Sequence, residues 1–426
     1  MTSTSSGEHL HLLPESSVDT SVPPNYHSWH VAEMNLPQHD VNLPAPQGKE
    51  GRYLMMNNHI WGIGWGNVLQ ELIFNAHLAY RTNRTFVFYN YTWSVDPGDI
   101  AMYNDKPIPA RIPITALLSG PIAGAPFPPA EKLPPAVSTE FYRQVCQNST
   151  RLRKDVMGTS LQDASASVIV QAWVDRISQV DDPCLEFEGD QLFDVWLFGD
   201  GQRMLDIWPS LSQSPIITEF AWSPLILSAV ETNRDLVHPA VARDPKHRAP
   251  LPGLLAMHVR RGDFVDHCMH FANWSSQYNA FNSFPQFPDR FTPPEGGGWG
   301  INTPENYAKY MDRCFPDIPS IVKRVMEIKA SATGRQLDRI YVLTNGPREW
   351  LAELKEALRR AATWKSITTS RDMRLSWEQK FVAQAVDMQI AQQADVFIGN
   401  GFSSLTSNVN MFRMAYGLPP EKTRFW

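Results

Sequence analysis

The sequence of 426 residues lacks the features that mark several large classes of protein. It contains no apolar run long enough to cross a membrane, so it predicts no transmembrane helix. Its polar N-terminal stretch has no apolar core of the kind that a secretory signal carries. Positive charge is not in excess, with 38 Lys and Arg against 44 Asp and Glu. We therefore expect no nucleic-acid partner, and any recognition of phosphate must be local.

Cysteine is scarce, and its even number allows pairing in three ways. The four residues are Cys146, Cys184, Cys268 and Cys314. Bridges between Cys146 and Cys184 and between Cys268 and Cys314 would join neighbours along the chain. Four free buried thiols are the alternative.

The sequence contains more acceptor sequons for N-glycosylation than the roughly two expected by chance. They begin at Asn83, Asn90, Asn148 and Asn273. This excess favours the lumen of the endoplasmic reticulum or Golgi. The polar N-terminus does not favour that compartment, because it lacks the apolar core of a signal. An anchor upstream of this chain would reconcile the two, and we expect membrane association only through such an anchor.

The distribution of apolar residues predicts a stem and two α/β halves. Residues 1–50 are polar and rich in serine and proline, so we expect a disordered stem. The N-terminal domain, 51–245, opens with a strand, a glycine-rich turn, a helix and a second strand, which together form a βαβ unit. The C-terminal domain, 246–426, alternates strands and helices again, with one helix expected over 376–394. No internal repeat is evident beyond this duplication of α/β halves.

Two further stretches lie inside the N-terminal domain. The apolar residues 168–173 predict a strand. Residues 93–135 are rich in proline and glycine and show no period, and long excursions of this kind in a compact domain are usually functional.

The first candidate site is the stretch His258-Val-Arg260-Arg261-Gly-Asp263-Phe, which follows an apolar strand. In open parallel sheets, ligands bind beyond the carboxyl ends of the strands. Alternation places Arg260 on the side of His258 and opposite Arg261. Two guanidinium groups at this position need phosphate oxygens or a carboxylate such as Asp263. We favour phosphate, and an Arg–Asp network that holds the loop is the alternative.

The second candidate site is the segment GNGFSSLTSN, residues 399–408, which follows a strand and opens a helix. Backbone N–H groups at a helix start bind anions, and the hydroxyl groups of Ser403, Ser404 and Thr406 can donate to phosphate oxygens. An ordinary Ser or Thr helix cap is the alternative for this segment alone. The neighbouring arginine motif favours the phosphate interpretation.

The glycine-rich turn GIGWGN, residues 62–67, lacks the last glycine of a dinucleotide-binding fingerprint. Asn67 occupies that position, and no acidic residue ends the following strand to hold a ribose. We therefore expect no nicotinamide or flavin cofactor. The turn instead allows the backbone at Gly64 and Gly66, together with Asn67, to approach a ligand closely.

No metal site is expected from the sequence. His267, Cys268 and His270 lack a second ligand pair of known spacing. Asp387 lies among apolar residues within a predicted helix, where spacing alone favours a solvated carboxylate. The sequence also lacks an ordered Ser–His–Asp set, a Walker loop and the kinase motifs.

Three segments together resemble the GDP-fucose protein O-fucosyltransferase family and the wider group containing the α1,6-fucosyltransferases. They are HVRRGDF, the GWGN turn with its helix and NRTFVF, and VDMQIAQQADVFIGNGFSSLTSNV. The resemblance runs in order over about residues 51–426. It implies a GT-B-like α/β fold, with two Rossmann-like domains facing across a cleft. It also implies that 51–245 is the acceptor-side domain and 246–426 binds GDP-fucose.

The resemblance also implies roles for individual residues. Arg260 contacts the diphosphate and neutralises the leaving GDP, and His258 supports the nucleotide site. Asp387 is similar to the family aspartate that contacts the base. Asn67 corresponds to an asparagine near the acceptor hydroxyl group. The segment wrapped around the diphosphate and guanosine is matched by Ser403, Ser404, Leu405 and Thr406.

The remaining expectations concern the loop and the chemistry. Arg261 is expected to anchor the loop through Asp263 or to reach a second phosphate. Family enzymes invert the anomeric carbon of fucose and bind the sugar nucleotide without a metal, so GDP-fucose is expected as donor with no cofactor. The general base is not identified, because Asn67 cannot accept a proton and Glu71 lies inside the helix.

The resemblance favours transfer of fucose to a Ser or Thr hydroxyl group of a protein. A fucosyltransferase acting on a glycan hydroxyl group is the alternative within enzymes. A non-catalytic protein of the same fold that binds a sugar nucleotide or a glycan is the alternative outside them.

Overall fold

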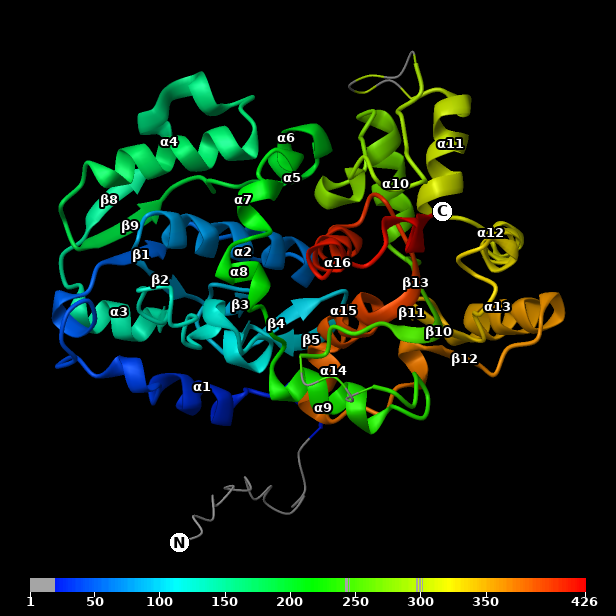
Figure 1. Ribbon diagram of the computed structural model, residues 1–426, viewed down its shortest axis with the longest axis horizontal. Coiled ribbons are helices and arrows are strands. Elements are labelled where there is room, and N and C mark those ends of the chain that lie inside the picture. The colour runs from blue at the N-terminus through cyan, green and yellow to red at the C-terminus, as the bar shows by residue number, and fades with distance from the viewer. Residues whose placement is uncertain (1–19, 242–243, 245, 296–297, 299, 301) are drawn as a thin grey trace, which may run out of the picture.

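The computed structural model describes residues 20–241, 244, 246–295, 298, 300 and 302–426. Two five-stranded parallel sheets, one in each half of the chain, form its framework (Figure 1). The α/β class expected from the sequence is therefore confirmed. The predicted domain boundary between residues 245 and 246 stays a prediction.

The first sheet has the strand order β7-β2-β1-β9-β8, and all its neighbouring strands are parallel. The helix α2, Trp65–Arg81, connects the adjacent strands β1 and β2. The strands are β1 Tyr53–Met56, β2 Thr85–Phe88, β7 Val137–Ser138, β8 Thr150–Arg153 and β9 Cys184–Glu188. The βαβ unit predicted from the sequence is thus confirmed.

The second sheet has the order β12-β11-β10-β13-β14 and is also parallel. Its strands are β10 Leu251–Val259, β11 Arg339–Thr344, β12 Ser366–Thr369, β13 Ala394–Gly399 and β14 Thr423–Phe425. Strand β10 lies at the centre and is apolar over successive residues, because helices cover both faces of the sheet.

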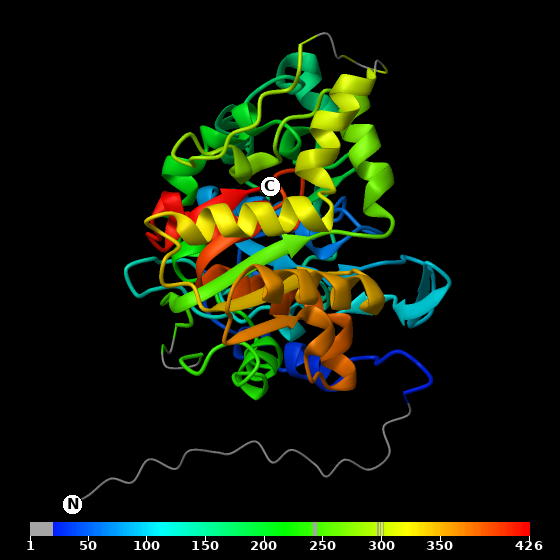
Figure 2. The same cartoon turned by 90° about the vertical axis from the view of Figure 1, so that its right-hand side faces the viewer.

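Alternate residues of β10 face different helices. Leu255 and Met257 pack in one cluster with α12, Ile318–Ala330, and α13, Arg348–Ala361, which lie on the outer face (Figure 2). Leu254 and Ala256 join the larger cluster, which holds α15, Ala383–Gln393, and α16, Ser404–Ala415. The carboxyl end of β10 therefore lies between two helical layers.

Two elements expected from the sequence are wrong. Residues 168–173 lie in a helix, α4, Ala166–Ser178, whose buried side chains recur at a helical spacing. The helix expected over 376–394 is two helices, α14 Trp377–Phe381 and α15, because the backbone leaves the helical conformation at Val382.

The expectation of a disordered stem over 1–50 is wrong for its described part, residues 20–50, and residues 1–19 lie outside the described residues. Helix α1, His27–Met34, follows the fully buried Tyr26, whose hydroxyl group donates to the carbonyl of Glu378 at 2.6 Å. Glu33 accepts hydrogen bonds from Thr115, and Gln38 donates to Gly124 and Ala136. Local composition does not reveal these contacts, because every partner is distant in the sequence.

Residues 93–135 contain a β-hairpin. Its strands are β4, Ile100–Tyr103, and β5, Lys106–Pro109, and they pair antiparallel. Asn104 and Asp105 connect them in the left-handed conformation that a two-residue hairpin turn requires.

Both local cysteine pairings form. Cys146, at the end of α3, Thr139–Val145, bonds Cys184 of β9. Cys268 of α10, Phe264–Asn273, bonds Cys314 of α11, Pro304–Cys314. Within the described ranges, no helix has both the length and the apolar character needed to span a membrane.

Candidate functional site

The carboxyl end of β10 is tied to the start of α16 by a neutral histidine. His258 is buried, and its Nδ1 lies 2.9 Å from the hydroxyl oxygen of Thr406. Burial and, second, the charge of Arg260 lower the pKa of His258 to about 3. The predicted supporting role of His258 is compatible with this contact, since it fixes the first turn of α16 against the strand.

Arg260 extends beyond the strand with few partners. Its side chain is 31% exposed and lies 3.6 Å from the carboxylate of Asp263, an ion pair of loose geometry. The guanidinium also lies over the ring of Phe264. Its Nε atom is buried and has no hydrogen-bond partner among the residues that the structure describes. Most donors of this guanidinium are therefore available to an anionic ligand.

Arg261 lies on the opposite side of the sheet, where its guanidinium contacts aromatic rings and carbonyl oxygens. Its guanidinium stacks between Phe315 and Trp350, with centroid distances of 4.5 and 4.1 Å, and donates to the carbonyls of Arg260 and Pro316. The expected anchoring of Arg261 by Asp263 is wrong, because Asp263 pairs with Arg260. A contact of Arg261 with a second phosphate stays a prediction.

The start of α16 carries no side-chain cap. Ser403 occupies the N-cap position, but its hydroxyl group makes no capping hydrogen bond. The ordinary-cap interpretation of this segment is therefore wrong for Ser403. The first N–H groups of α16 lack partners within the helix, which is the usual arrangement of an anion site.

The start of α2 lies directly against the start of α16. A Cβ atom added to Gly66 would come within 2.6 Å of the backbone nitrogen of Leu405 and 2.7 Å of the hydroxyl oxygen of Ser404. The side chain of Asn408 donates to the carbonyl of Gly66 at 2.7 Å. Only glycine allows this approach, so the glycine-rich turn and the predicted nucleotide segment come together.

Asn67 and Gly64 flank this contact. Asn67 is half-buried in the first turn of α2, and Gly64 is exposed at its N-cap, where no side chain caps the helix. Two uncapped helix starts, one from each half, therefore meet at Gly66.

The hairpin supplies a side wall that sequence reasoning missed. The hydroxyl group of Tyr103 lies 3.5 Å from a carboxylate oxygen of Asp263, and its ring packs on Trp93 at 4.8 Å. Thr92 accepts a hydrogen bond from Gly62 in the glycine-rich turn. The Asn-Asp turn between two short extended runs was the signal that could have located this hairpin.

Asp387 occupies a pocket of hydroxyl groups rather than a solvated helix face. Its carboxylate accepts hydrogen bonds from Tyr341 at 2.6 Å and from Ser370 at 2.8 Å, which come from β11 and the end of β12. Burial raises the pKa of Asp387 to about 7. The solvated interpretation is wrong, and the predicted contact with the base stays a prediction.

Glu71 holds the loop that precedes α2. The residue is 1% exposed, and its carboxylate accepts the N–H of Ile60 at 2.8 Å. It also interacts with Tyr89 and Asn75, and His59 stacks on Tyr89 with 3.9 Å between ring centroids. Burial raises the pKa of Glu71 to about 8. A carboxylate so enclosed positions the loop and does not reach an acceptor.

The pH dependence of stability tests this placement of Glu71. A folded-state pKa raised from 4.5 to about 8 contributes stability below the lower value, which is lost as pH rises through the higher one. The contribution lost is on the order of 4 kcal/mol. The neutral Glu71→Gln protein should therefore become more stable relative to wild type between pH 5 and 8. Urea unfolding of both proteins at each pH measures the difference, and a constant difference would contradict the buried carboxyl group.

The disulfide removes one of the candidate metal ligands His267, Cys268 and His270. Cys268 is bonded to Cys314 and is not available as a metal ligand. Over the described parts of the chain, no group of three or more His, Cys, Asp or Glu side chains is arranged to hold a metal ion. Metal-independent binding of the donor stays a prediction.

The site is built from strand ends and helix starts, which is where ligands bind in open parallel α/β sheets. Residues 220–416 match the family model described as GDP-fucose protein O-fucosyltransferase. The matched segment contains two of the three motifs, HVRRGDF and VDMQIAQQADVFIGNGFSSLTSNV.

Solved structures of two proteins are similar to this chain, and one of them reaches a TM-score of 0.50. A structure of POFUT1 in complex with GDP is 14% identical with a TM-score of 0.50, and the match covers 88% of this chain and 97% of that chain. POFUT1 in complex with GDP-fucose is 15% identical with a TM-score of 0.45, with coverage of 88% and 97%. A mutant of Arabidopsis thaliana FUT1 in complex with GDP is 11% identical with a TM-score of 0.39, covering 91% and 72%. No curated protein matches the sequence.

Proposed function

We propose that the protein transfers fucose from GDP-fucose to a Ser or Thr hydroxyl group of a protein, with inversion at the anomeric carbon. The observation that carries the proposal is the Arg260 guanidinium, which has one loose ion pair and an unpartnered Nε and follows the residue pair His258–Thr406 at the uncapped start of α16, within the residues that match the family model. Departure of GDP builds negative charge on the β-phosphate. Preorganised donors aimed at that charge lower the barrier, and they do so without a metal.

The acceptor side is supplied by the other half of the chain. Asn67 lies at the start of α2 beside the Gly66 contact, and the hairpin residue Tyr103 approaches Asp263 next to Arg260. The apolar side chains of Ile100 and Met102 on this hairpin are exposed and can contact a folded acceptor domain. In inversion, the acceptor hydroxyl group attacks from the face opposite GDP, so donor and acceptor contacts must come from different elements.

We propose the lumen of the endoplasmic reticulum or Golgi as the compartment. The two disulfides support it, because such bonds persist in oxidising environments. The exposed Asn148 offers one sequon to a glycosylating enzyme.

An acceptor panel tests the proposal. Purified protein is incubated with GDP-fucose and a folded disulfide-rich domain, the same domain reduced and unfolded, or free N-glycans. We expect transfer to the folded domain alone, and an α-linked product from the β-linked donor by NMR. Transfer to glycans alone would contradict a protein acceptor and favour the glycan alternative. Binding of GDP-fucose with no transfer to any acceptor would favour the non-catalytic alternative.

A further inference from the structure

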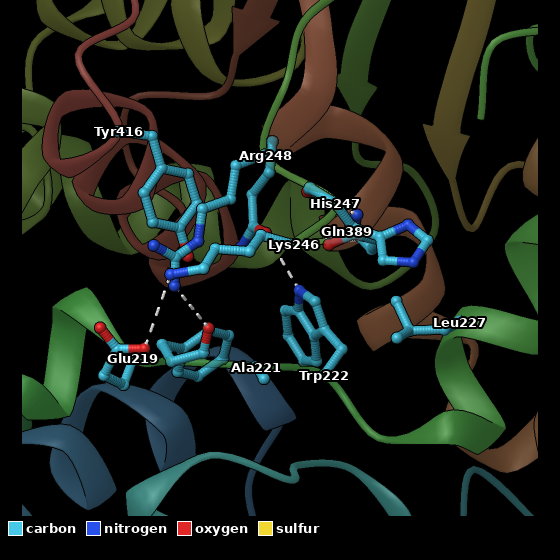
Figure 3. A pocket seen from close by; sticks show the side chains of 11 residues that line it. Glu219, Ala221, Trp222, Leu227, Lys246, His247, Arg248, Gln389 and Tyr416 are labelled. Atoms are coloured by element: carbon cyan, nitrogen blue, oxygen red, sulfur yellow. Dashed lines mark hydrogen bonds and ion pairs between the residues drawn. The ribbon is translucent and has the colours of Figure 1, made fainter. Parts of the chain in front are cut away.

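A cavity of about 150 Å³ lies between the two halves, and Figure 3 shows the side chains that line it. One wall is formed by residues 219–222, which follow the helix α8, Pro215–Thr218. The opposite wall is formed by Gln389 and Gln392 of α15 and by Tyr416. Residues 246–248, Lys-His-Arg, close the cavity.

The length of α16 separates this cavity from the donor site. Thr406 lies in the first turn of α16, whereas Tyr416 follows its last residue. A helix of this length spans about 18 Å at the usual rise per residue. A ligand in the cavity would therefore be distinct from the nucleotide.

Three buried nitrogen atoms beside the cavity have no hydrogen-bond partner within the described residues. Gln392 is 1% exposed, and its Oε1 accepts from the Trp222 indole at 3.0 Å while its Nε2 is unpartnered. The Nε of Arg248 is unpartnered, although its Nη2 donates to the carbonyl of Phe220 at 3.2 Å. The third atom is Nδ1 of His247, which donates or accepts according to the tautomer. Leaving the Gln392 and Arg248 donors unsatisfied costs about 1–3 kcal/mol each, so the cavity favours a ligand that accepts hydrogen bonds.

The charges around the cavity are mainly positive. Lys246 and Arg248 both face Glu219, whose carboxylate lies 3.8 Å from the Lys246 ammonium (Figure 3). A second carboxylate, that of Asp244, accepts the backbone N–H groups of Lys246 and Arg248. The guanidinium of Arg248 lies 4.5 Å from the ring centroid of Tyr416, which fixes its plane. Among the residues that line the cavity, two cations stand against one carboxylate beside an aromatic wall, where electrostatic attraction is stronger than in water.

We infer that this cavity binds a small free oxyanion, a phosphate or a carboxylate, through Arg248, Lys246 and the amide of Gln392. Donors and positive charge together match an oxyanion. The volume is below the 300–1,000 Å³ or so of pockets for drug-sized ligands, so the site suits an ion with its water rather than a nucleotide.

Calorimetric titration with inorganic phosphate and, separately, with acetate tests the inference at constant ionic strength. GDP is present in excess to fill the donor site, and Arg260→Ala protein serves as a second background in which phosphate cannot use that arginine. We expect saturable binding of at least one of the two ions in both settings. Binding of phosphate alone would identify the ligand as a phosphate, and binding of acetate alone would identify it as a carboxylate.

Variants locate the binding. Arg248→Met keeps the packing on Tyr416 and removes the guanidinium, and Gln392→Glu keeps the acceptor for Trp222 while replacing the donor by a negative charge. Each should weaken ion binding at least tenfold, whereas Lys323→Met, on the exposed face of α12, should not change it. Absence of saturable binding, or binding that survives both Arg248→Met and Gln392→Glu, would show an ordinary water-filled cavity and overturn the inference. Neither result depends on the acceptor or on transfer.

Discussion

Replacing Arg260 by alanine is expected to reduce the rate of fucose transfer by about 100- to 1,000-fold, with little change in stability. The side chain is 31% exposed, makes one loose ion pair and lies over the ring of Phe264, so its removal costs little stability. Its loss removes the donors that would meet the charge developing on GDP. Arg260→Lys should recover only part of the rate, because an ammonium lacks the bidentate fork.

Initial transfer rates and the affinity for GDP measure the effect, and the neighbouring arginine provides the matched control. Arg261 stacks between Phe315 and Trp350, so Arg261→Ala should lower the free energy of unfolding by about 1–3 kcal/mol. A folded Arg261→Ala protein with unchanged affinity for GDP would confine Arg261 to packing, whereas a weaker affinity would assign it the second phosphate. An Arg260→Ala protein that transfers fucose at the wild-type rate would remove Arg260 from the proposed mechanism.

Deleting residues 1–50 is expected to destabilise the protein by at least about 3 kcal/mol relative to a protein that lacks residues 1–19 alone. The longer deletion removes Tyr26, which is fully buried, and burial of a large aromatic side chain typically contributes 3–5 kcal/mol or so. It also leaves Thr115 without Glu33, and the carbonyls of Gly124 and Ala136 without Gln38. Each lost hydrogen bond adds about 1 kcal/mol.

Urea unfolding of both truncated proteins measures this difference. Tyr26→Phe separates the packing of the ring from its hydrogen bond to Glu378, and should cost only about 1 kcal/mol. Equal unfolding midpoints for the two truncated proteins would mean that residues 20–50 contribute nothing to stability.

The elements that the sequence predicted best carry a continuous apolar run or apolar residues at a helical spacing. The central strands β10 and β13 are continuous apolar runs because helices cover both faces of their sheet, and α2 has apolar residues at a helical spacing after a glycine-rich start. Short apolar runs are ambiguous between strand and helix, which explains the error at α4.

The features that the sequence could not predict depend on distant partners. The hydroxyl group of Tyr26 donates a hydrogen bond to Glu378, 352 positions away, and nothing near Tyr26 in the chain indicates that it is buried. Motifs placed Arg260 and the Ser403 segment at the site, but they did not assign Asp263 to Arg260 rather than to Arg261. The role of Glu71 depends on the loop at Ile60 folding back onto α2, which no periodicity encodes.

The bond between Cys268 and Cys314 supports the loop that carries Arg260, and it can form only after both cysteines have been synthesised. Helix α10 begins immediately after Asp263, so the bridge from α10 to α11 braces the loop that carries Arg260. Cys314 must be synthesised before that disulfide can form, and a disulfide requires an oxidising environment. Formation of the bond that braces this loop is thus an oxidation, which depends on the redox state around the chain.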